Sequence, residues 1–170
     1  MTQHSLIIRP VEPRDARDIN MMRRMPKVAE NLLALPSEPI VNNEKFIANL
    51  SDNDHIFCAE TIINDVPAVI GLAGLHVRKL ARERHTALLG IMVHTDFHKN
   101  GVGSRLMETI IDLADNWLLL KRVGLTVFPD NSPAIRLYEK FGFVVEGTMK
   151  YAATRRGKLA DVLLMARYCV

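Results

Sequence analysis

Residues 89–106 hold the feature that most constrains the fold, which is an apolar run, a short loop with two glycines, and an amphipathic run. The apolar run is typical of a buried strand, and the amphipathic run of a helix over residues 103–118. A strand that enters a helix through a glycine loop forms an anion site. The first helical N–H groups lack helical partners there, and the helix dipole favours negative charge. The sequence therefore predicts a phosphorylated ligand at this loop.

Two common phosphate-binding loops do not match this segment. The Walker loop requires a Gly-Lys-Ser/Thr ending that is absent, and the dinucleotide fingerprint requires a third small residue where Leu106 stands. The remaining pattern is the short loop from His98 to Gly103. By itself this loop is also typical of an ordinary turn whose glycines serve backbone geometry.

Size and composition limit the classes of protein that this chain belongs to. With 170 residues we expect one domain over residues 1–170. The net charge of +3 suits a small anionic ligand and is too weak to indicate nucleic acid. Two cysteines are too few for a disulfide framework, and no apolar run is long enough to span a membrane. We therefore expect a cytoplasmic protein with no nucleic-acid or membrane partner.

The pattern of apolar runs and turn residues predicts an alternation of strands and helices. We expect strands at 5–9, 55–63, 66–77, 85–94, 123–128, 143–147 and 161–168, and helices at 13–22, from Asn42 or Asn43 to 50, 103–118 and from Ser132-Pro133 to 141. Asn64-Asp65 favours a tight hairpin turn, residues 26–39 a loop or broken helix, and residues 155–158 a basic loop. This order predicts a mixed α/β fold with helices on the faces of a mixed sheet.

A second group of residues gives the phosphate loop a context. Asn131, Ala134, Tyr138 and the Gly142-Phe143 pair follow it in a fixed order. Together with the loop, this set resembles the GNAT superfamily of acetyl-CoA-dependent N-acetyltransferases. The opening Ile8-Arg9-Pro10 with Asp15 strengthens the likeness, as do the segments 115–118, 125–135, 146–148 with Tyr151, and 165–167. The later segments resemble a bacterial branch that acts on free L-amino acids.

The resemblance implies a fold and a cofactor site. The fold is a mostly antiparallel sheet of six to seven strands with about four helices, in which a splayed parallel pair of strands holds acetyl-CoA. Backbone groups of residues 91–93 would pair with the pantetheine arm, and N–H groups of residues 99–104 would hold the pyrophosphate. The implied cofactor-binding residues are Ile91, Met92, Val93, His98, Lys99, Asn100, Gly101, Val102, Gly103, Ser104, Arg105, Asn131 and Arg136.

Several roles remain open at this stage. His98 stands where the family usually has Arg or Gln, and Asn131 either caps the following helix or contacts the cofactor arm. The resemblance makes Tyr138 the proton donor to the leaving thiolate, although Tyr138 also lies on the apolar face of its helix, and a phenol suits that chemistry. His94 and His98 do not form a metal pair on one helix face, so we expect no metal.

The general base is not identified by the sequence. Several relatives have an acidic residue where this chain has Leu88. His85, His76, Glu60 and Glu146 are nearby candidates, and a base that acts through water is a further alternative.

The expected activity is direct transfer of acetyl from acetyl-CoA to a primary amine of a small molecule, with a free L-amino acid or analogue as the first choice. A polyamine, a protein N-terminus, and a non-catalytic CoA-binding sensor or scaffold are the alternatives. The resemblance also suggests a homodimer. The basic loop at 155–158 either closes the acceptor site, joins a partner, or is solvated.

Overall fold

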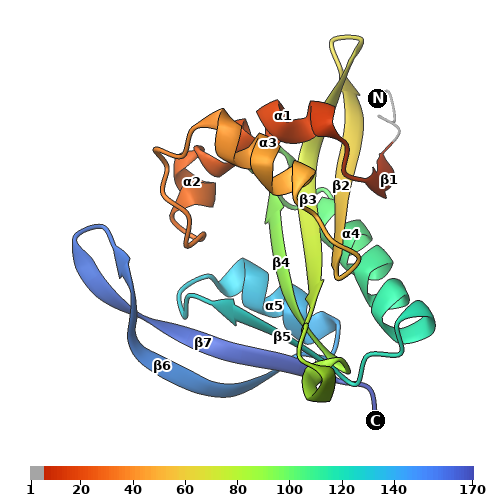
Figure 1. Cartoon of the computed structure of the whole chain (residues 1–170). Coiled ribbons are helices and arrows are strands. Elements are labelled where there is room, and N and C mark those ends of the chain that lie inside the picture. The colour runs from red at the N-terminus through yellow and green to blue at the C-terminus, as the bar shows by residue number, and fades with distance from the viewer. Residues whose placement is uncertain (1–5) are drawn as a thin grey trace.

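The computed structural model describes residues 6–170, and its centre is one seven-stranded sheet (Figure 1). The strand order is β1-β2-β3-β4-β5-β7-β6, and the β4–β5 pair is parallel while the other pairs are antiparallel. The strands are β1 Ile7–Pro10, β2 Asp54–Ile63, β3 Val66–Val77, β4 Thr86–Val93, β5 Arg122–Val127, β6 Val144–Arg155 and β7 Lys158–Tyr168. The predicted mixed, mostly antiparallel sheet is confirmed.

The helices lie on both faces of this sheet. The α-helices are α1 Ala16–Arg23, α2 Pro26–Ala29, α3 Ile40–Ala48, α4 Val102–Asp112 and α5 Ser132–Lys140. Three 3₁₀ turns (η1 Pro13–Asp15, η2 Ala81–Glu83, η3 Thr95–Phe97) and a π turn (η4 Leu113–Trp117) complete the described chain. About four helices were expected, and the additional one is α2, which Pro26 begins at a favourable N-terminal position.

Two hydrophobic clusters lie on the two faces of the sheet. The larger cluster joins the sheet to α4 and α5, with Leu106, Ile110 and Tyr138 among its members. The smaller cluster joins the other face to α1 and α3, with Ile19 and Ile47 among its members. The phosphate loop and α5 therefore lie toward one face, and α1–α3 cover part of the other (Figure 1).

Several predicted boundaries need correction. Helix α3 begins at Ile40 after Pro39, so neither Asn42 nor Asn43 caps it. Trp117, expected on the buried face of its helix, is 76% exposed because the π turn shifts the later residues around the axis. Strand β1 continues through Pro10, which an edge strand tolerates, and the expected first residue Ser5 lies outside the described residues.

The two long hairpins are joined by tight turns. Asn64 and Asp65 have positive φ angles of 51° and 63°, which confirms the predicted turn. The expected loop at 155–158 is instead a two-residue turn at Arg156-Gly157, and β6 and β7 continue to either side of it. At the tip of this hairpin Arg156 pairs with Glu30 beside α2, so the hairpin contacts the helical side of the molecule (Figure 1).

Asn43 is a buried polar residue with an unusual environment. Its side chain is fully buried in α3, and neither its oxygen nor its nitrogen has a hydrogen-bond partner among the described residues. A buried polar group without a partner costs about 1–3 kcal/mol. Asn43→Leu is therefore expected to raise the free energy of unfolding by about 1 kcal/mol or more in urea titrations. The exposed neighbour provides the control, because Asn42→Leu should change this value by less than about 0.5 kcal/mol. A lower stability for Asn43→Leu would contradict the prediction.

Within residues 6–170, no helix has the length and apolar character that crossing a bilayer requires.

Candidate functional site

A gap between β4 and β5 is the first part of the site. These parallel strands pair only at Thr86–Arg122, Ala87–Val123 and Leu88–Gly124, and the remainder of β4 pairs with β3 alone. The N–H of His94 donates to Ile70 of the β3 side at 2.8 Å, so the alternation of the ladder turns the backbone groups of Ile91 and Val93 toward the gap. The predicted splayed pair is therefore confirmed, with a free strand edge along the second half of β4.

By the same alternation, the backbone groups of Met92 face β3, where Met92 pairs with Leu72. The Met92 side chain is buried in the smaller hydrophobic cluster. Of the three residues expected to pair with a pantetheine arm, Ile91 and Val93 thus present their backbone groups to the gap, and Met92 does not.

The phosphate loop follows directly from the end of β4. The His98 imidazole hydrogen-bonds the Val93 carbonyl through Nε2 at 2.9 Å, which ties the loop to the strand edge. Lys99 and Gly101 have positive φ angles of 63° and 79°, a conformation that glycine adopts without strain. Helix α4 then starts at Val102 without a side-chain cap. The first N–H groups of α4 therefore have no side-chain acceptor from the cap residue, a geometry that suits an anion.

Contacts between α4 and α5 shape this anion site. A Cβ atom on Gly103 would lie 3.2 Å from the Leu137 side chain, so the glycine allows the two helices to approach closely. Lys140 of α5 reaches the same place, with its Nζ 3.4 Å from the Ser104 hydroxyl. Lys140 lies 36 residues from Ser104 in sequence, and no local motif indicated this contact.

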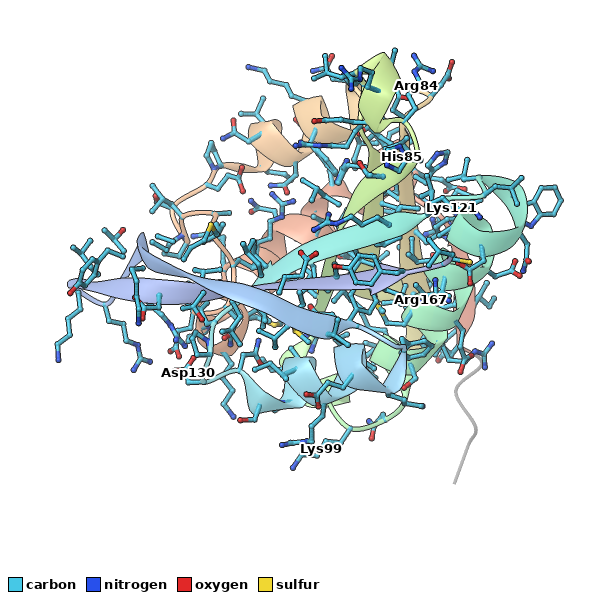
Figure 2. The ribbon with its side chains drawn as sticks, turned by 90° about the horizontal axis from the view of Figure 1, so that it is seen from below. Arg84, His85, Lys99, Lys121, Asp130 and Arg167 are labelled. Atoms are coloured by element: carbon cyan, nitrogen blue, oxygen red, sulfur yellow. The ribbon has the colours of Figure 1, made fainter. Side chains whose placement is uncertain are left out.

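Three of the implied cofactor-binding residues are cations at the surface of this region. Lys99, Arg105 and Arg136 are exposed. Figure 2 shows Lys99 extending into solvent beside α5. Asn100 is likewise exposed in the loop before α4.

Tyr138 occupies a rigid position at the C-terminal end of α5. Its carbonyl accepts the Phe143 N–H at 3.1 Å, and the Gly142 N–H bonds Glu139 at 3.0 Å, which together form a Schellman cap. Gly142 supplies the positive φ of 85°, and the Phe143 ring packs 5.9 Å from the Tyr138 ring. The Gly142-Phe143 motif therefore fixes the position of Tyr138. Burial raises the pKa of the Tyr138 hydroxyl to about 12.

Asn131 has the capping role that was one of its two alternatives. Its side-chain oxygen accepts the Ala134 N–H at 3.4 Å at the start of α5. Ser132-Pro133 therefore forms the first turn rather than the cap. The adjacent Asp130 pairs with Arg155 at 2.7 Å and connects this turn to the β6–β7 hairpin (Figure 2).

A cavity of about 210 Å³ lies on the opposite face of β4. Its floor is formed by the paired glycines Gly74 and Gly90, and a Cβ atom on Gly90 would meet no other atom within 4 Å. The walls are largely apolar, and Arg23 and His76 are the charged or titratable side chains among them. The lining residues are Arg23, Leu32, Leu33, Ala34, Phe46, Ile56, Leu72, Gly74, His76, Gly90, Ile91 and Met92.

Only one of the four candidate bases lines this cavity. His76 does so, whereas Glu60 is bound by Arg9 at 2.5 Å and by Arg14 at 3.2 Å. His85 precedes the first residue of β4, at the opposite end from Lys99 (Figure 2).

Glu146 is also engaged elsewhere. Its carboxylate accepts hydrogen bonds from Tyr168 and Arg122, and the Tyr168 bond contributes most to lowering the pKa of Glu146. A carboxylate held ionised in this way is a weak base. Leu88, at the expected acidic position, pairs with His76 across the ladder and supplies no proton acceptor.

Comparison with known proteins identifies the family. Residues 22–143 match the model of the Acetyltransferase (GNAT) family. The L-amino acid N-acetyltransferase AaaT of Escherichia coli strain K12 is 36% identical to this chain, over 95% of this chain and 97% of AaaT. The chain belongs to the GNAT family and is an acetyltransferase.

Solved structures agree with this fold. The acetyltransferase of the GNAT family from Streptococcus pneumoniae superimposes with a TM-score of 0.80 at 28% identity, over 98% of this chain and 100% of the other. Spermidine N-acetyltransferase from Vibrio cholerae in complex with CoA and spermine gives a TM-score of 0.82 at 23% identity, over 96% and 95% of the two chains. At that identity the second match shows a shared fold.

Proposed function

We propose that this acetyltransferase moves acetyl from acetyl-CoA to the α-amine of a free L-amino acid with an apolar side chain. The observation that carries the proposal is the lining of the cavity beside β4, which combines one guanidinium with apolar walls. An amino acid needs a cation for its carboxylate and an apolar surface for its side chain. The likeness to AaaT over nearly the whole chain supports the same class of acceptor.

Arg23 is the group we propose for the substrate carboxylate. It bonds Glu38 through Nη1 at 3.1 Å and lies 5.6 Å from the centre of the Phe46 ring. A guanidinium has five N–H donors, so the pair with Glu38 leaves donors for a second carboxylate. The volume of about 210 Å³ lies below the ~300–1,000 Å³ typical of drug-sized ligands, which favours a small acceptor.

A polyamine is the main rival, because spermidine N(1)-acetyltransferase of Escherichia coli strain K12 is 22% identical to this chain, over 95% of this chain and 85% of that enzyme. A polycation requires carboxylates along its path. Among the residues that line the cavity none is a carboxylate, and the nearby carboxylates of Glu38 and Asp54 are already bonded to Arg23 and His76. The lining therefore favours the amino acid.

The cofactor site is proposed on the other side of the β4 edge. The free backbone N–H and C=O of Ile91, the N–H of Val93 and the uncapped start of α4 fit a phosphopantetheine cofactor, and the Val93 carbonyl is held by His98. Ile91 and Val93 would pair with its arm like an added strand, and the N–H groups of residues 99–104 would hold its pyrophosphate. Lys140 joins Lys99, Arg105 and Arg136 as a proposed phosphate contact. Bound there, acetyl-CoA supplies the activated thioester.

Catalysis then rests on what the chain itself does with the two substrates. The proposed cofactor site and the proposed acceptor site meet at Ile91. Its backbone groups face the gap between β4 and β5, and Ile91 also lines the acceptor cavity. Holding amine and thioester together at this point removes much of the entropic barrier. A β4 N–H directed at the carbonyl oxygen would stabilise the negative charge that develops there.

Exchanging Arg23 tests the acceptor class. Loss of a charge-assisted hydrogen bond costs about 1.5–3 kcal/mol, so Arg23→Leu should raise the KM for L-leucine by about 10- to 150-fold. The KM for 3-methylbutylamine, which lacks the carboxylate, should hardly change. Steady-state assays of CoA release with both acceptors measure these values.

Arg24→Leu is the matched control, because it removes the same charge from the next residue, which does not line this cavity. Equal effects of the two substitutions on the KM for L-leucine would refute the role of Arg23. Equal catalytic efficiency of the unaltered enzyme with both acceptors would refute the proposed substrate class.

Three further properties are proposed for this protein. We retain one domain over residues 1–170, a cytoplasmic location and a homodimer. The contact of Arg156 with Glu30 favours a role for the hairpin tip near the acceptor side, since α2 and the cavity residues Leu32 and Leu33 adjoin Glu30 in sequence.

A further inference from the structure

His76 and Asp54 form a hydrogen-bonded pair beside the acceptor cavity. Nδ1 of His76 lies 2.7 Å from Oδ1 of Asp54, across the β2–β3 ladder. The second carboxylate oxygen of Asp54 accepts the Ser51 N–H at 2.9 Å and the Ser51 hydroxyl at 2.6 Å. Both oxygens of Asp54 are therefore bonded, and this geometry fixes the plane of the imidazole.

The other ring nitrogen of His76 faces the cavity. The ring lies over Gly74, because a Cβ atom on that residue would be 3.3 Å from Nε2 of His76. Gly74 pairs with Gly90 of β4, which is the residue before Ile91. A Cβ atom at position 74 would also lie 2.8 Å from Cδ1 of Ile56, so the absence of a side chain at Gly74 leaves room for both Ile56 and the ring.

The charge of Asp54 determines which nitrogen carries the proton. The hydrogen bonds from His76 and Ser51 hold the pKa of Asp54 well below its ordinary range, so the carboxylate stays ionised. An ionised carboxylate accepts the Nδ1–H of the neutral ring and leaves Nε2 with a free lone pair. The ring thus presents a proton acceptor to the cavity.

We propose that His76 is the general base that takes the proton from the acceptor amine, and that Asp54 is the positioning residue that orients it. This inference rests on the proposed function. The nitrogen of an ammonium acceptor loses two protons, one to Nε2 of His76 and then to water, and one that finishes on the departing sulfur. The new bond joins the amine nitrogen to the acetyl carbon, and the carbon–sulfur bond breaks.

Few charged side chains lie next to His76 in the described part of the chain. From β4, the neighbours of His76 are Leu88 and Gly90, which carry no charge. From β2 the charged neighbour is Asp54, and across the cavity the charged lining residue is Arg23. Among the described groups around the ring, His76 is therefore the one that can accept the proton of the amine.

His76→Asn tests the proposal with little change in structure. The asparagine amide can still donate to Asp54 but accepts no proton at this pH. A general base contributes about 10²- to 10⁴-fold, so kcat with L-leucine should fall by that factor while the KM for acetyl-CoA is unchanged. The kcat/KM of the variant should rise with pH until the substrate amine itself titrates, whereas the unaltered enzyme reaches its plateau at lower pH.

Two further variants make the test decisive. Asp54→Asn should also lower kcat and change the pH profile. A thermal-shift assay of CoA binding verifies that each variant is folded. His85→Asn is the control and should keep full activity, because His85 precedes the first residue of β4 and does not line the cavity.

The result that overturns this inference is a His76→Asn enzyme with kcat within threefold of the unaltered enzyme, or with the same pH profile. If the unaltered enzyme fails to acetylate any amino acid, the proposed function fails instead.

Discussion

Tyr138→Phe is expected to lower kcat by about 10²- to 10⁴-fold and to leave the affinity for acetyl-CoA almost unchanged. The leaving thiolate requires a proton, and phenylalanine keeps the ring but removes the donor. Burial raises the pKa of Tyr138 to about 12, so the hydroxyl stays protonated below that pH and can act as an acid. Steady-state CoA release gives kcat, and calorimetry gives the dissociation constant of acetyl-CoA.

The structure predicts that this variant folds normally. The Phe143 ring and the Schellman cap of α5 do not depend on the hydroxyl. Tyr151→Phe is the matched control, because Tyr151 is exposed on the β6–β7 hairpin and should tolerate the change. A Tyr138→Phe enzyme with normal kcat would exclude Tyr138 as the proton donor.

Asp15→Ala is expected to lower the free energy of unfolding by about 3–5 kcal/mol, because it removes one partner of a buried ion pair. Asp15 is 3% exposed and accepts two hydrogen bonds from Arg9, at 2.8 and 2.9 Å, and one from the Glu12 N–H at 2.7 Å. Arg9 also contacts Glu60, so this cluster joins β1, η1 and β2. Urea unfolding at neutral pH measures the loss.

The same pair gives a prediction for acid. Burial raises the pKa of Asp15, but the hydrogen bonds from Arg9 and from the Glu12 backbone outweigh that effect and lower it overall. The stabilisation is therefore complete above the unfolded pKa of about 3.9 and is lost as the pH falls through the lower folded value. The difference in the free energy of unfolding between the unaltered protein and Asp15→Ala should therefore become smaller as the pH falls below this range.

An exposed ion pair is the control for the stability experiment. Glu83 lies 3.3 Å from Arg78, and both side chains are about half exposed, so Glu83→Ala should cost less than about 1 kcal/mol. If Asp15→Ala costs no more than Glu83→Ala, the buried cluster does not stabilise the fold as described.

The parts of the fold that local chemistry determines were predicted from the sequence. Asn64-Asp65 tolerates positive φ and marked the β2–β3 hairpin, and the loop with two glycines predicted a helix from residue 103, one residue after α4 begins. The resemblance added the splay of β4 and β5, which the strand register confirms. These features depend on neighbours in sequence or on a motif.

The Asp54–His76 pair shows why the acceptor site was harder to predict. A regular hairpin with a turn at residues 64–65 would place Asp54 opposite Leu75, which points to the other face of the sheet. A β-bulge at Ala59/Glu60 shifts the register by one residue and brings Asp54 opposite His76. No residue type in that segment predicts the bulge, so the pairing of Asp54 with His76 was not predicted.

Other missed features also depend on contacts between distant segments. Arg23 joins residues of β2, β3 and β4 around the cavity, and Lys140 reaches the start of α4 from α5. Trp117 was placed on the wrong side because the helix widens into a π turn before it. Each of these depends on packing that a single sequence does not display.

The most direct test of the central claim is CoA release from acetyl-CoA by the unaltered enzyme with four acceptors. These are L-leucine, 3-methylbutylamine, spermidine and a short peptide with a free N-terminus. A guanidinium beside apolar walls predicts that L-leucine has the highest kcat/KM, by about tenfold or more over each of the others. A preference for spermidine or the peptide, or binding of acetyl-CoA without CoA release from any acceptor, would contradict the account.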